Sequence, residues 1–363
     1  MLTTCTRKRV TLKTVSITPM RPRPNPRTLL ACLGLVLTQL VWTQASISEQ
    51  RPLAGERVRL VVGFGAGGGY DVYARMLAPH LEQETGATVV VENWTGGGGV
   101  VALNRLATDD TEGLTLMLVN GPSAVMGQVL GNEGVRYDVS AFTWLGRVFA
   151  EPSVVLASPV SPYRSLADLT SADLPVRWAS AGKTTTAGTP ALVSQALKLR
   201  SEVIIGYKGT SESALAALRG EADLVAMSAT SARAQAHKNG LVPIAVVSHE
   251  RISLLPEVAT VAEQINLTPS QNRWIDYGIT VMGLGRSLAT SEHVSPERRE
   301  YLRRVVKNIL TDTTVIREAA AQGRPIEFGP PSELLASINR ALANENEPTR
   351  GELRHVILEK FNP

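Results

Sequence analysis

The sequence predicts an α/β protein with two domains, each built on a sheet of buried strands linked by helices. Three observations predict this class. Short apolar runs stopped by glycine alternate with segments of helical spacing along most of the chain. This alternation comes in two series, the second of which begins near residue 176. A length of 363 residues is enough for two domains of ordinary size.

The segment 58–101 carries the clearest pattern in the chain. Its two apolar runs, Val58–Val62 and Thr88–Val91, predict buried parallel strands, because each is short and is followed by glycines. Residues Asp71–Glu84 between them have apolar side chains at helical spacing, with Asp71 as the predicted N-cap. Five glycines between 63 and 69 follow the first strand, and Gly96–Gly99 follow the second.

These two glycine clusters predict an anion site. A turn from a strand into a helix leaves backbone N–H groups without partners, and the helix dipole favours negative charge there. Glycine lets a ligand approach this backbone closely. We therefore expect the two turns, Phe64–Asp71 and Thr95–Gly98, to bind one carboxylate together.

Further strands and helices alternate up to residue 248, which implies parallel sheets. Apolar runs predict strands at Leu114–Val119, Phe142–Phe149, Ser153–Ser158, Val176–Ala179, Glu202–Gly206, Ala222–Met227 and Pro243–Ser248. Helical spacing predicts helices at Ser123–Leu130, Ser165–Leu169, Thr189–Leu199, Ser213–Arg219 and Ser231–Lys238. The apolar run Asp276–Met282 is expected to carry the chain back to the first domain. The remainder is expected to form helices at Ser295–Leu310, Thr313–Gln322 and Ser332–Asn346.

Residues 1–45 have the composition of an export signal, with seven basic residues and no acidic one. The apolar run Leu29–Leu40 is too short to span a bilayer comfortably, and Thr43-Gln44-Ala45 has the form of a cleavage site. Because the basic stretch is long for a signal peptide, the start is either Met1 or Met20. A membrane anchor is the alternative, and Cys32 stands too early in the apolar run for a lipoprotein signal.

Composition argues against several classes of function. After residue 45 the chain has 30 basic and 33 acidic residues, so its net charge of −3 gives no support to a nucleic-acid partner. Both cysteines, Cys5 and Cys32, precede the predicted cleavage site, so the mature chain would have no disulfide and no catalytic thiol. The scattered histidines have no metal-binding spacing, and no metal or cofactor is expected. No serine lies in a nucleophile motif, so we predict no catalytic residue and no enzyme activity.

The first glycine turn also fits a dinucleotide-binding motif. Gly63–Gly68 matches G-x-G-x-x-G after a strand, and Glu92 closes the next strand, where such folds place the acid that binds ribose. Asp71 would then lie close to the pyrophosphate, and the second glycine cluster would fill the ribose pocket, which argues against this function. Gly182-Lys183-Thr184 is not a phosphate loop, because Arg177 stands where the motif needs glycine. The hydroxyl groups around it either cap a helix or bind a ligand oxygen.

Several motifs in this order resemble the substrate-binding proteins of tripartite tricarboxylate transporters, also called the Bug family. VVGFGAGGGYDVYAR at Val61–Arg75 is similar to the first family signature, and VVVENWTGGGG at Val89–Gly99 is similar to the second. Further similar segments are Ala179–Thr186, Gly206–Gly209, Ala222–Met227, Gly240–Ser248 and Leu255–Glu263. The identity of the ligand does not carry over, because the sequence departs from the family pattern at Gly63, Thr95-Gly96 and Thr186-Ala187.

The resemblance implies a periplasmic binding protein type II-like fold, in which two α/β lobes joined by crossing strands enclose a ligand cleft. The expected organisation is a signal peptide at 1–45, the first part of lobe 1 at 51–156, lobe 2 at 157–274, and a return to lobe 1 with C-terminal helices at 275–363. It also implies a periplasmic protein that delivers a small carboxylate to the membrane permease subunits of a tripartite tricarboxylate transporter. We expect it to be a monomer.

The expected site combines both lobes. Backbone N–H groups of the first lobe bind the carboxylate, and the second lobe closes over its far end by a hinge motion. Asp71 either caps its helix or accepts an amino group of the ligand. The alternatives left open are a ligand-sensing binding protein for a sensor kinase, an exported α/β enzyme and a dinucleotide-binding protein. The expected ligand-binding residues are Phe64, Gly65, Ala66, Gly67, Gly68, Gly69, Tyr70, Asp71, Thr95, Gly96, Gly97, Gly98, Asn120, Ser123, Lys183, Thr184, Thr185, Thr186, Tyr207 and Ser228.

Overall fold

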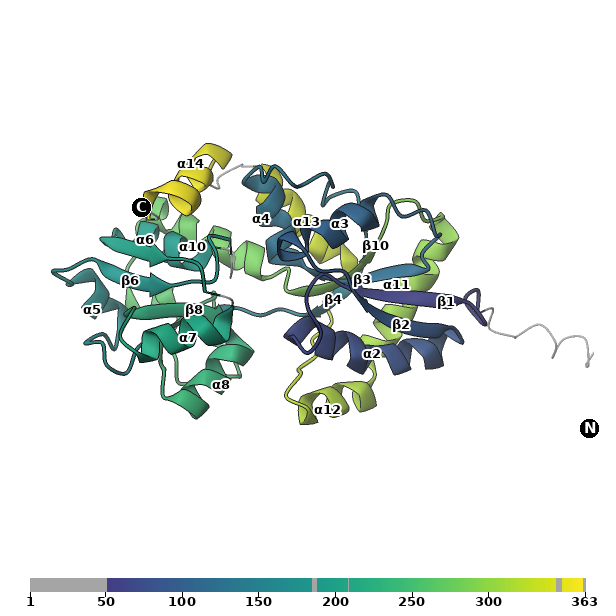
Figure 1. Ribbon diagram of the computed structural model, residues 1–363, viewed down its shortest axis with the longest axis horizontal. Helices are drawn as coiled ribbons and strands as arrows, with labels where there is room; N and C mark the ends of the chain where they lie inside the picture. The colour runs from purple at the N-terminus through teal and green to yellow at the C-terminus, as the bar shows by residue number, and fades with distance from the viewer. Residues whose placement is uncertain (1–50, 185–187, 208, 344–347, 362–363) are drawn as a thin grey trace, which may run out of the picture. The chain divides into compact units, whose positions relative to one another are not determined.

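Two mixed five-stranded sheets organise the residues that the computed structural model describes, which are 51–184, 188–207, 209–343 and 348–361 (Figure 1). Residues 51–363 cluster as one unit, and the predicted signal peptide at 1–45 lies outside the described residues. In the described part, every helix is too short or too polar to cross a membrane.

The first sheet has the strand order β2-β1-β3-β10-β4. Its strands are β1 (Arg57–Val62), β2 (Thr88–Asn93), β3 (Thr115–Asn120), β4 (Thr143–Phe149) and β10 (Arg286–Thr290). β1 runs parallel to β2 and β3, whereas β10 runs antiparallel to β3 and β4. This sheet and the helices that pack on it are called the first lobe below.

Alternate residues of the first sheet face two different sets of helices. Leu60 and Val62 of β1 belong to the core cluster with helices α2 (Gly69–Thr85) and α11 (Pro296–Thr311), and α12 (Thr313–Ala321) adjoins it. Val61 between them belongs to the cluster on the other face, with α3 (Val100–Ala107), α4 (Gly121–Val129) and α13 (Pro331–Ala343). Both faces of Leu60–Val62 are therefore buried, which explains why these three residues of β1 are all apolar.

The second sheet has the strand order β7-β6-β8-β5-β9 and forms the second lobe. Its strands are β5 (Ser153–Ala157), β6 (Val176–Ala179), β7 (Ser201–Ile204), β8 (Leu224–Ser228) and β9 (Val242–Val247). β5 runs antiparallel to both β8 and β9, and β6 runs parallel to β7 and β8. The helices of this lobe are α5 (Leu166–Thr170), α6 (Thr189–Leu197), α7 (Thr210–Leu218), α8 (Ala229–Asn239) and α9 (Val261–Gln264).

The chain passes between the two lobes more than once. It leaves β4 of the first sheet and enters β5 of the second through residues 150–152. Helix α10 (Pro269–Met282) packs against α6 of the second lobe and against α4 and α13 of the first, and it leads into β10. The C-terminal elements α14 (Arg350–Arg354) and the π-helical turn η3 (His355–Lys360) return to the second lobe, where the Val203 amide donates to the Phe361 carbonyl at 2.7 Å.

The α/β fold class is confirmed, and the predicted strands and helices up to residue 248 are present with small shifts of their ends. One expectation was wrong: the sheets are mixed rather than parallel, because β5 and β10 run antiparallel to their neighbours. The run Asp276–Met282, which was expected to carry the chain back, is the second half of α10 and leads into β10. Strand β10 itself was not predicted.

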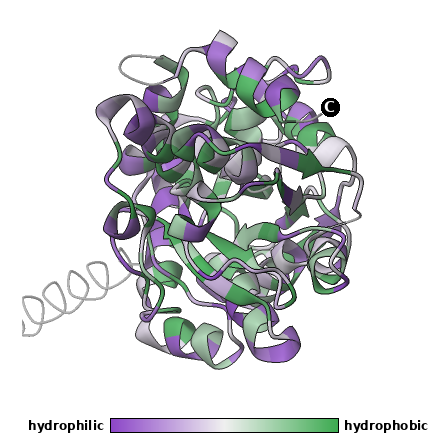
Figure 2. Cartoon of the chain, turned by 90° about the vertical axis from the view of Figure 1, so that its left-hand side faces the viewer, coloured by the Kyte–Doolittle hydropathy of each residue, from purple (hydrophilic) through white to green (hydrophobic). Residues whose placement is uncertain are grey.

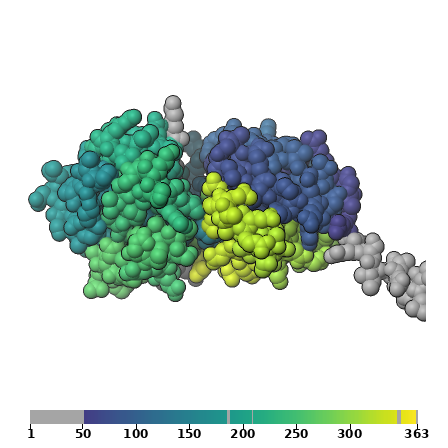
Figure 3. Space-filling model, turned by 90° about the horizontal axis from the view of Figure 1, so that it is seen from below, coloured from purple at the N-terminus to yellow at the C-terminus, as the bar shows by residue number. Residues whose placement is uncertain are grey.

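Two further views agree with this arrangement of sheets and helices. Hydrophobic residues concentrate on the central strands and hydrophilic ones on the outer helices (Figure 2). In the space-filling view, the second lobe and the first lobe stand as two masses with a groove between them (Figure 3). Two cavities are lined by residues of both lobes.

Candidate functional site

The two glycine turns of the first lobe lie side by side. β1 and β2 are parallel, with Val62 opposite Asn93, so both turns leave the same edge of the sheet. The Asn93 amide group donates to the Phe64 carbonyl and to Asp71 Oδ1, both at 2.9 Å, which ties the turns together. A Cβ atom on Gly63 would lie only 2.9 Å from the Gly99 Cα atom, so glycine is required for this close approach.

The second turn has a backbone that only glycine adopts without strain. Gly96, Gly97, Gly98 and Gly99 all have positive φ angles, with +68° at Gly98. The amides of Gly99 and Val101 donate to the Gly96 carbonyl, at 3.0 and 3.4 Å. Gly97 and Gly98 sit between these bonds and line the larger cavity. Gly97 and Gly98 are therefore the part of this turn that lines the cavity.

Asp71 fixes the first turn from within. Its carboxylate accepts from Arg75 Nε at 2.9 Å, from the Gly67 amide at 2.8 Å and from Asn93 at 2.9 Å. The hydrogen bonds from Arg75, then Gly67 and Asn93, lower the pKa of Asp71 to about 2 against the opposing effect of burial. The expectation that Asp71 is the N-cap was wrong, because α2 begins at Gly69 after Gly68 as N-cap, and Asp71 lies in the first turn.

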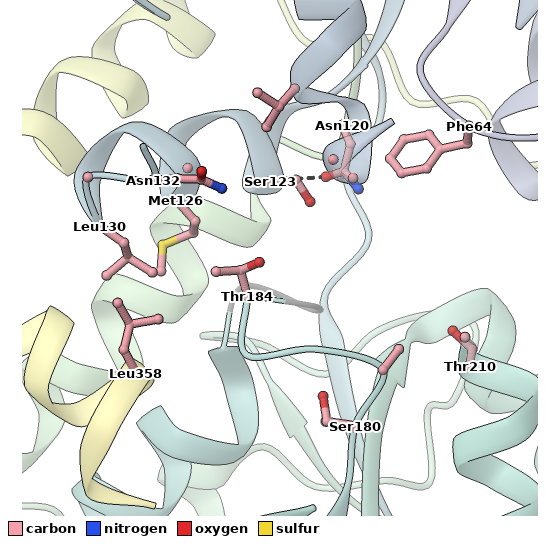
Figure 4. Close-up of a pocket in the computed structure, with 18 of the residues that line it drawn as sticks. Phe64, Asn120, Ser123, Met126, Leu130, Asn132, Ser180, Thr184, Thr210 and Leu358 are labelled. Carbon is pink, nitrogen blue, oxygen red and sulfur yellow. Dashed lines mark hydrogen bonds between the residues drawn. The ribbon is translucent and has the colours of Figure 1, made fainter. Parts of the chain in front are cut away.

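The larger cavity has a volume of about 690 Å³ and is lined by both lobes (Figure 4). The first lobe contributes Phe64, the two glycines of the second turn, and Asn120 and Ser123 at the start of α4. Asn120 is the N-cap of α4, and its Oδ1 accepts from the Ser123 amide at 3.1 Å. The second lobe contributes the hydroxyl groups of Ser180, Thr184, Thr210 and Ser213. Polar residues of both lobes therefore line the same cavity.

The smaller cavity, of about 260 Å³, continues from the larger one, since Asn120, Ser123 and Thr210 line both. Its other residues include Gly69 and Tyr70 of the first turn and Ser228 and Ser231 of the second lobe. Arg286 and Glu151 also line it and form a buried ion pair, in which each side chain is 8% exposed. The smaller cavity thus joins the first glycine turn to the region where the chain crosses between the lobes.

Aromatic rings hold the Arg286 guanidinium in place. Its central carbon lies 4.7 Å from the centroid of the Tyr70 ring and 4.8 Å from that of Tyr73. Burial raises the pKa of both tyrosines, to about 12 for Tyr73, although the nearby Arg286 charge opposes the shift. Both phenols are therefore neutral at physiological pH and serve as ring faces for the cation.

The structure brings part of the predicted site together. The larger cavity is lined by Phe64, Gly97, Gly98, Asn120, Ser123 and Thr184, and the smaller one by Gly69, Tyr70, Asn120, Ser123 and Ser228. Neither cavity is lined by Gly65, Ala66, Gly67, Gly68, Asp71, Thr95 or Gly96, which belong to the same two turns. Thr185 and Thr186 lie outside the described residues.

Two predicted residues of the second lobe have other contacts. Lys183 Nζ donates to the Leu358 carbonyl at 2.5 Å, which binds the C-terminal turn η3. Tyr207 packs against Ala179, Ala216 and Ala222, and it lines neither of the two cavities. Both residues therefore have a structural contact, and their contact with a ligand stays a prediction.

Sequence reasoning missed two groups of lining residues. The sequence could have indicated Arg286 and Glu151 as a pair. A charged residue in or next to a buried strand needs a partner of opposite charge. Met126, Leu130 and Leu358 at the other end of the larger cavity carry no such signal, since apolar residues of a helix are ordinarily core residues. Among the described residues, no group of three or more His, Cys, Asp or Glu side chains is placed to hold a metal ion.

Comparisons with known proteins match this chain to a family of receptors. The family model described as the tripartite tricarboxylate transporter family receptor, TctC, matches residues 73–277. The protein BugT of Bordetella pertussis is 26% identical over 310 residues, which are 82% of this chain and 89% of BugT.

Two solved structures share the fold. MatC from Rhodopseudomonas palustris with bound malate is 19% identical with a TM-score of 0.62, and the match covers 83% of this chain and 98% of MatC. A second R. palustris protein, solved with adipate, is 20% identical with a TM-score of 0.64, covering 79% and 94% of the two chains. The match to the receptor model spans more than half of the sequence, and this chain is therefore a member of the TctC, or Bug, family of tripartite tricarboxylate transporter receptors.

Proposed function

We propose that this protein is an exported, periplasmic solute-binding protein that captures a small carboxylate between its lobes and delivers it to the permease of a tripartite tricarboxylate transporter. The observation that carries the proposal is the pair of joined cavities, lined by backbone and polar groups of both lobes. Proteins of the same fold that were solved with malate and with adipate support a carboxylate as the ligand.

In this proposal the first lobe binds the carboxylate. The amides of Gly97 and Gly98 and the hydroxyl group of Ser123 offer hydrogen bonds to its oxygens. A hydrogen bond to a charged group contributes about 1.5–3 kcal/mol, so several of them support micromolar binding after the cost of association.

The second lobe completes the site by closing over the ligand. Thr184 and Thr210 lie across the cavity from Ser123, and their hydroxyl groups can donate to the same ligand (Figure 4). The Ser180 hydroxyl donates to the Gly182 carbonyl at 2.9 Å. A closed form is stabilised only because the ligand contacts both lobes, so binding shifts the population of the two forms. The permease would recognise the closed form, and no bond is made or broken.

Two measurements test this function. Isothermal titration calorimetry of the chain from residue 51 with malate, adipate, hexanoate and propionate should detect binding of at least one carboxylate. Uptake of that carboxylate by the source cells should then fall when either this gene or the permease gene is deleted. Uptake that persists without this gene would contradict transport, and a neighbouring sensor kinase that loses its response would favour sensing. Turnover of the bound carboxylate would instead indicate an enzyme.

A further inference from the structure

The smaller cavity is lined by two charged groups of opposite sign and by hydroxyl groups. Its charged side chains are those of Arg286 and Glu151, which form the buried ion pair. Four aliphatic hydroxyl groups line it as well, those of Ser123, Thr210, Ser228 and Ser231. A volume of about 260 Å³ has room for several polar groups of a ligand, since a water molecule occupies about 30 Å³ in the liquid. The cavity is therefore polar, but its charges cancel.

Arg286 has more hydrogen-bond donors than Glu151 binds. Its Nη1 group donates to Glu151 Oε2. Within the described part of the chain, the buried Nε atom of Arg286 has no hydrogen-bond partner. Nη2 lies beside the first glycine turn, 3.3 Å from the place that a Cβ on Gly69 would take. Because a guanidinium carries five N–H donors, Arg286 retains donors for an acceptor in the cavity.

Glu151 and the serines of α8 supply the complementary groups. Glu151 Oε1 accepts from the Thr230 hydroxyl and Oε2 accepts from Arg286. Since each carboxylate oxygen can accept about two hydrogen bonds, Glu151 can accept another donor. The Ser228 hydroxyl donates to Ser231 Oγ at 3.2 Å, so the Ser231 hydroxyl keeps its own proton to donate. The smaller cavity therefore offers both donors and acceptors.

The position and the charge of this cavity favour an uncharged group of the ligand. A carboxylate at Gly97 and Gly98 lies in the larger cavity, which leads into the smaller one past Ser123. A second carboxylate there would lose its hydration and face Glu151, while Arg286 is already paired. A hydroxyl group carries no charge, and it can accept from Arg286 and donate to Glu151.

We infer that the smaller cavity is a subsite for an uncharged, hydroxylated end of the ligand, and that the preferred ligand is a polyhydroxy monocarboxylate such as a sugar acid. This inference rests on the proposed carboxylate-binding function and adds the class of ligand to it. The second glycine turn binds the carboxylate, and Arg286, Glu151 and Ser231 bind the hydroxyl groups.

Three carboxylates with carbon chains of the same length test the inference. Gluconate carries hydroxyl groups along its chain, hexanoate carries none, and adipate carries a second carboxylate in their place. By calorimetry, the chain from residue 51 should bind gluconate about tenfold or more tightly than either hexanoate or adipate, because only gluconate satisfies the polar groups of the smaller cavity without adding a charge.

Removal of one hydroxyl group tests the subsite itself. Ser231→Ala should weaken gluconate binding about three- to tenfold and leave hexanoate binding within about twofold, since alanine suits helix α8 and only a polar contact is lost. Ser332→Ala is the control, because Ser332 is an exposed serine at the start of α13 that lines neither cavity. It should leave both affinities unchanged.

A change of charge gives an independent test. Glu151→Gln would give the smaller cavity a net positive charge from Arg286, which favours a second carboxylate. The ratio of the gluconate affinity to the adipate affinity should therefore fall about tenfold in this variant. Thermal melting of each variant reports whether it is folded, and the Ser231→Ala comparison decides if Glu151→Gln does not fold.

The outcomes distinguish this inference from the function on which it rests. Gluconate binding no tighter than hexanoate or adipate binding would overturn the hydroxyl subsite and leave the carboxylate-binding function in place. An equal loss of gluconate and hexanoate binding in folded Ser231→Ala, or an unchanged affinity ratio in folded Glu151→Gln, would overturn it too. Failure to bind gluconate and every other carboxylate tested would contradict the proposed function itself.

Discussion

Arg286 of the first lobe forms a buried ion pair with Glu151 of the segment that crosses to the second lobe. Glu151 also accepts a hydrogen bond from the Thr230 hydroxyl of α8, so its carboxylate joins the two lobes. Arg286 lies between the rings of Tyr70 and Tyr73, and the Tyr70 ring belongs to the first glycine turn. The segment that crosses between the lobes is therefore linked to the first glycine turn through the Arg286–Glu151 pair and the Tyr70 ring.

Removal of the Glu151 charge should destabilise the protein strongly. In Glu151→Gln, the guanidinium of Arg286 stays buried without a counter-charge, which costs about 3–5 kcal/mol. Urea unfolding followed by circular dichroism measures this loss. The matched control is Glu300→Gln in the exposed pair with Arg303, where a change below about 1 kcal/mol is expected. Similar losses in the two variants would refute a special role for the buried pair.

A negative charge at position 120 should repel the ligand without harm to the fold. Aspartate caps a helix as well as asparagine does, so Asn120→Asp should preserve the start of α4. Its carboxylate would face both cavities, and we expect the affinity for a carboxylate ligand to fall about tenfold or more. Asn120→Ser, a neutral cap, is the control for calorimetry. Equal affinities of the two variants would show that no carboxylate binds near Asn120.

Gly98 and Gly323 offer a matched pair of left-handed glycines. Their φ angles are +68° and +66°, and neither has an atom within 4 Å of the place that a Cβ would take. Alanine at either position should cost about 1–2 kcal/mol of stability through backbone strain. Only Gly98→Ala should also weaken carboxylate binding, because Gly98 lines the larger cavity. Unchanged binding by the folded Gly98→Ala variant would remove this turn from the site.

The Asp71 contacts should appear as a dependence of stability on pH. The pKa of Asp71 is about 2 in the folded chain and about 3.9 in an unfolded one. Its contribution is therefore complete above about pH 4 and is lost as the pH falls through about 2. It amounts to about 1–2 kcal/mol, because solvent screens the half-exposed Arg75.

The variant Asp71→Asn isolates this contribution from that of other carboxylates. Its free energy of unfolding in urea should lie below that of the unchanged chain at pH 7, and the two values should approach each other toward pH 2. A difference in free energy of unfolding that stays constant over this range would mean that the charge of Asp71 does not contribute to stability. Only the shape of its side chain would then matter.

Local patterns in the sequence were sufficient for most elements of the fold. β1 and β2 each contain a run of three apolar residues, Leu60–Val62 and Val89–Val91, with a glycine cluster soon after, so their type and their turns follow from neighbouring residues alone. Asn120 and Ser123 were found for the same reason, because they follow β3 at the edge where parallel strands end. Such features need no knowledge of distant contacts.

Features set by distant contacts could not be predicted. β10 is a strand of five residues that begins with Arg286 and includes two other polar residues, and it is buried only because β3 and β4 flank it. The lining of the larger cavity brings together Leu130 and Leu358, which are more than 200 residues apart. The contact between the Lys183 amine and the Leu358 carbonyl joins residues 175 positions apart, and nothing in the polar turn around Lys183 indicated it.

The most direct test of the central claim observes the glycine amides themselves during binding. The chain from residue 51, labelled with ¹⁵N only at glycine, would be titrated with a carboxylate that calorimetry has shown to bind. The amide signals of Gly97 and Gly98 should move and saturate with the calorimetric affinity, while that of the remote Gly323 stays in place. Saturated binding that leaves the signals of Gly97 and Gly98 unmoved would contradict the account.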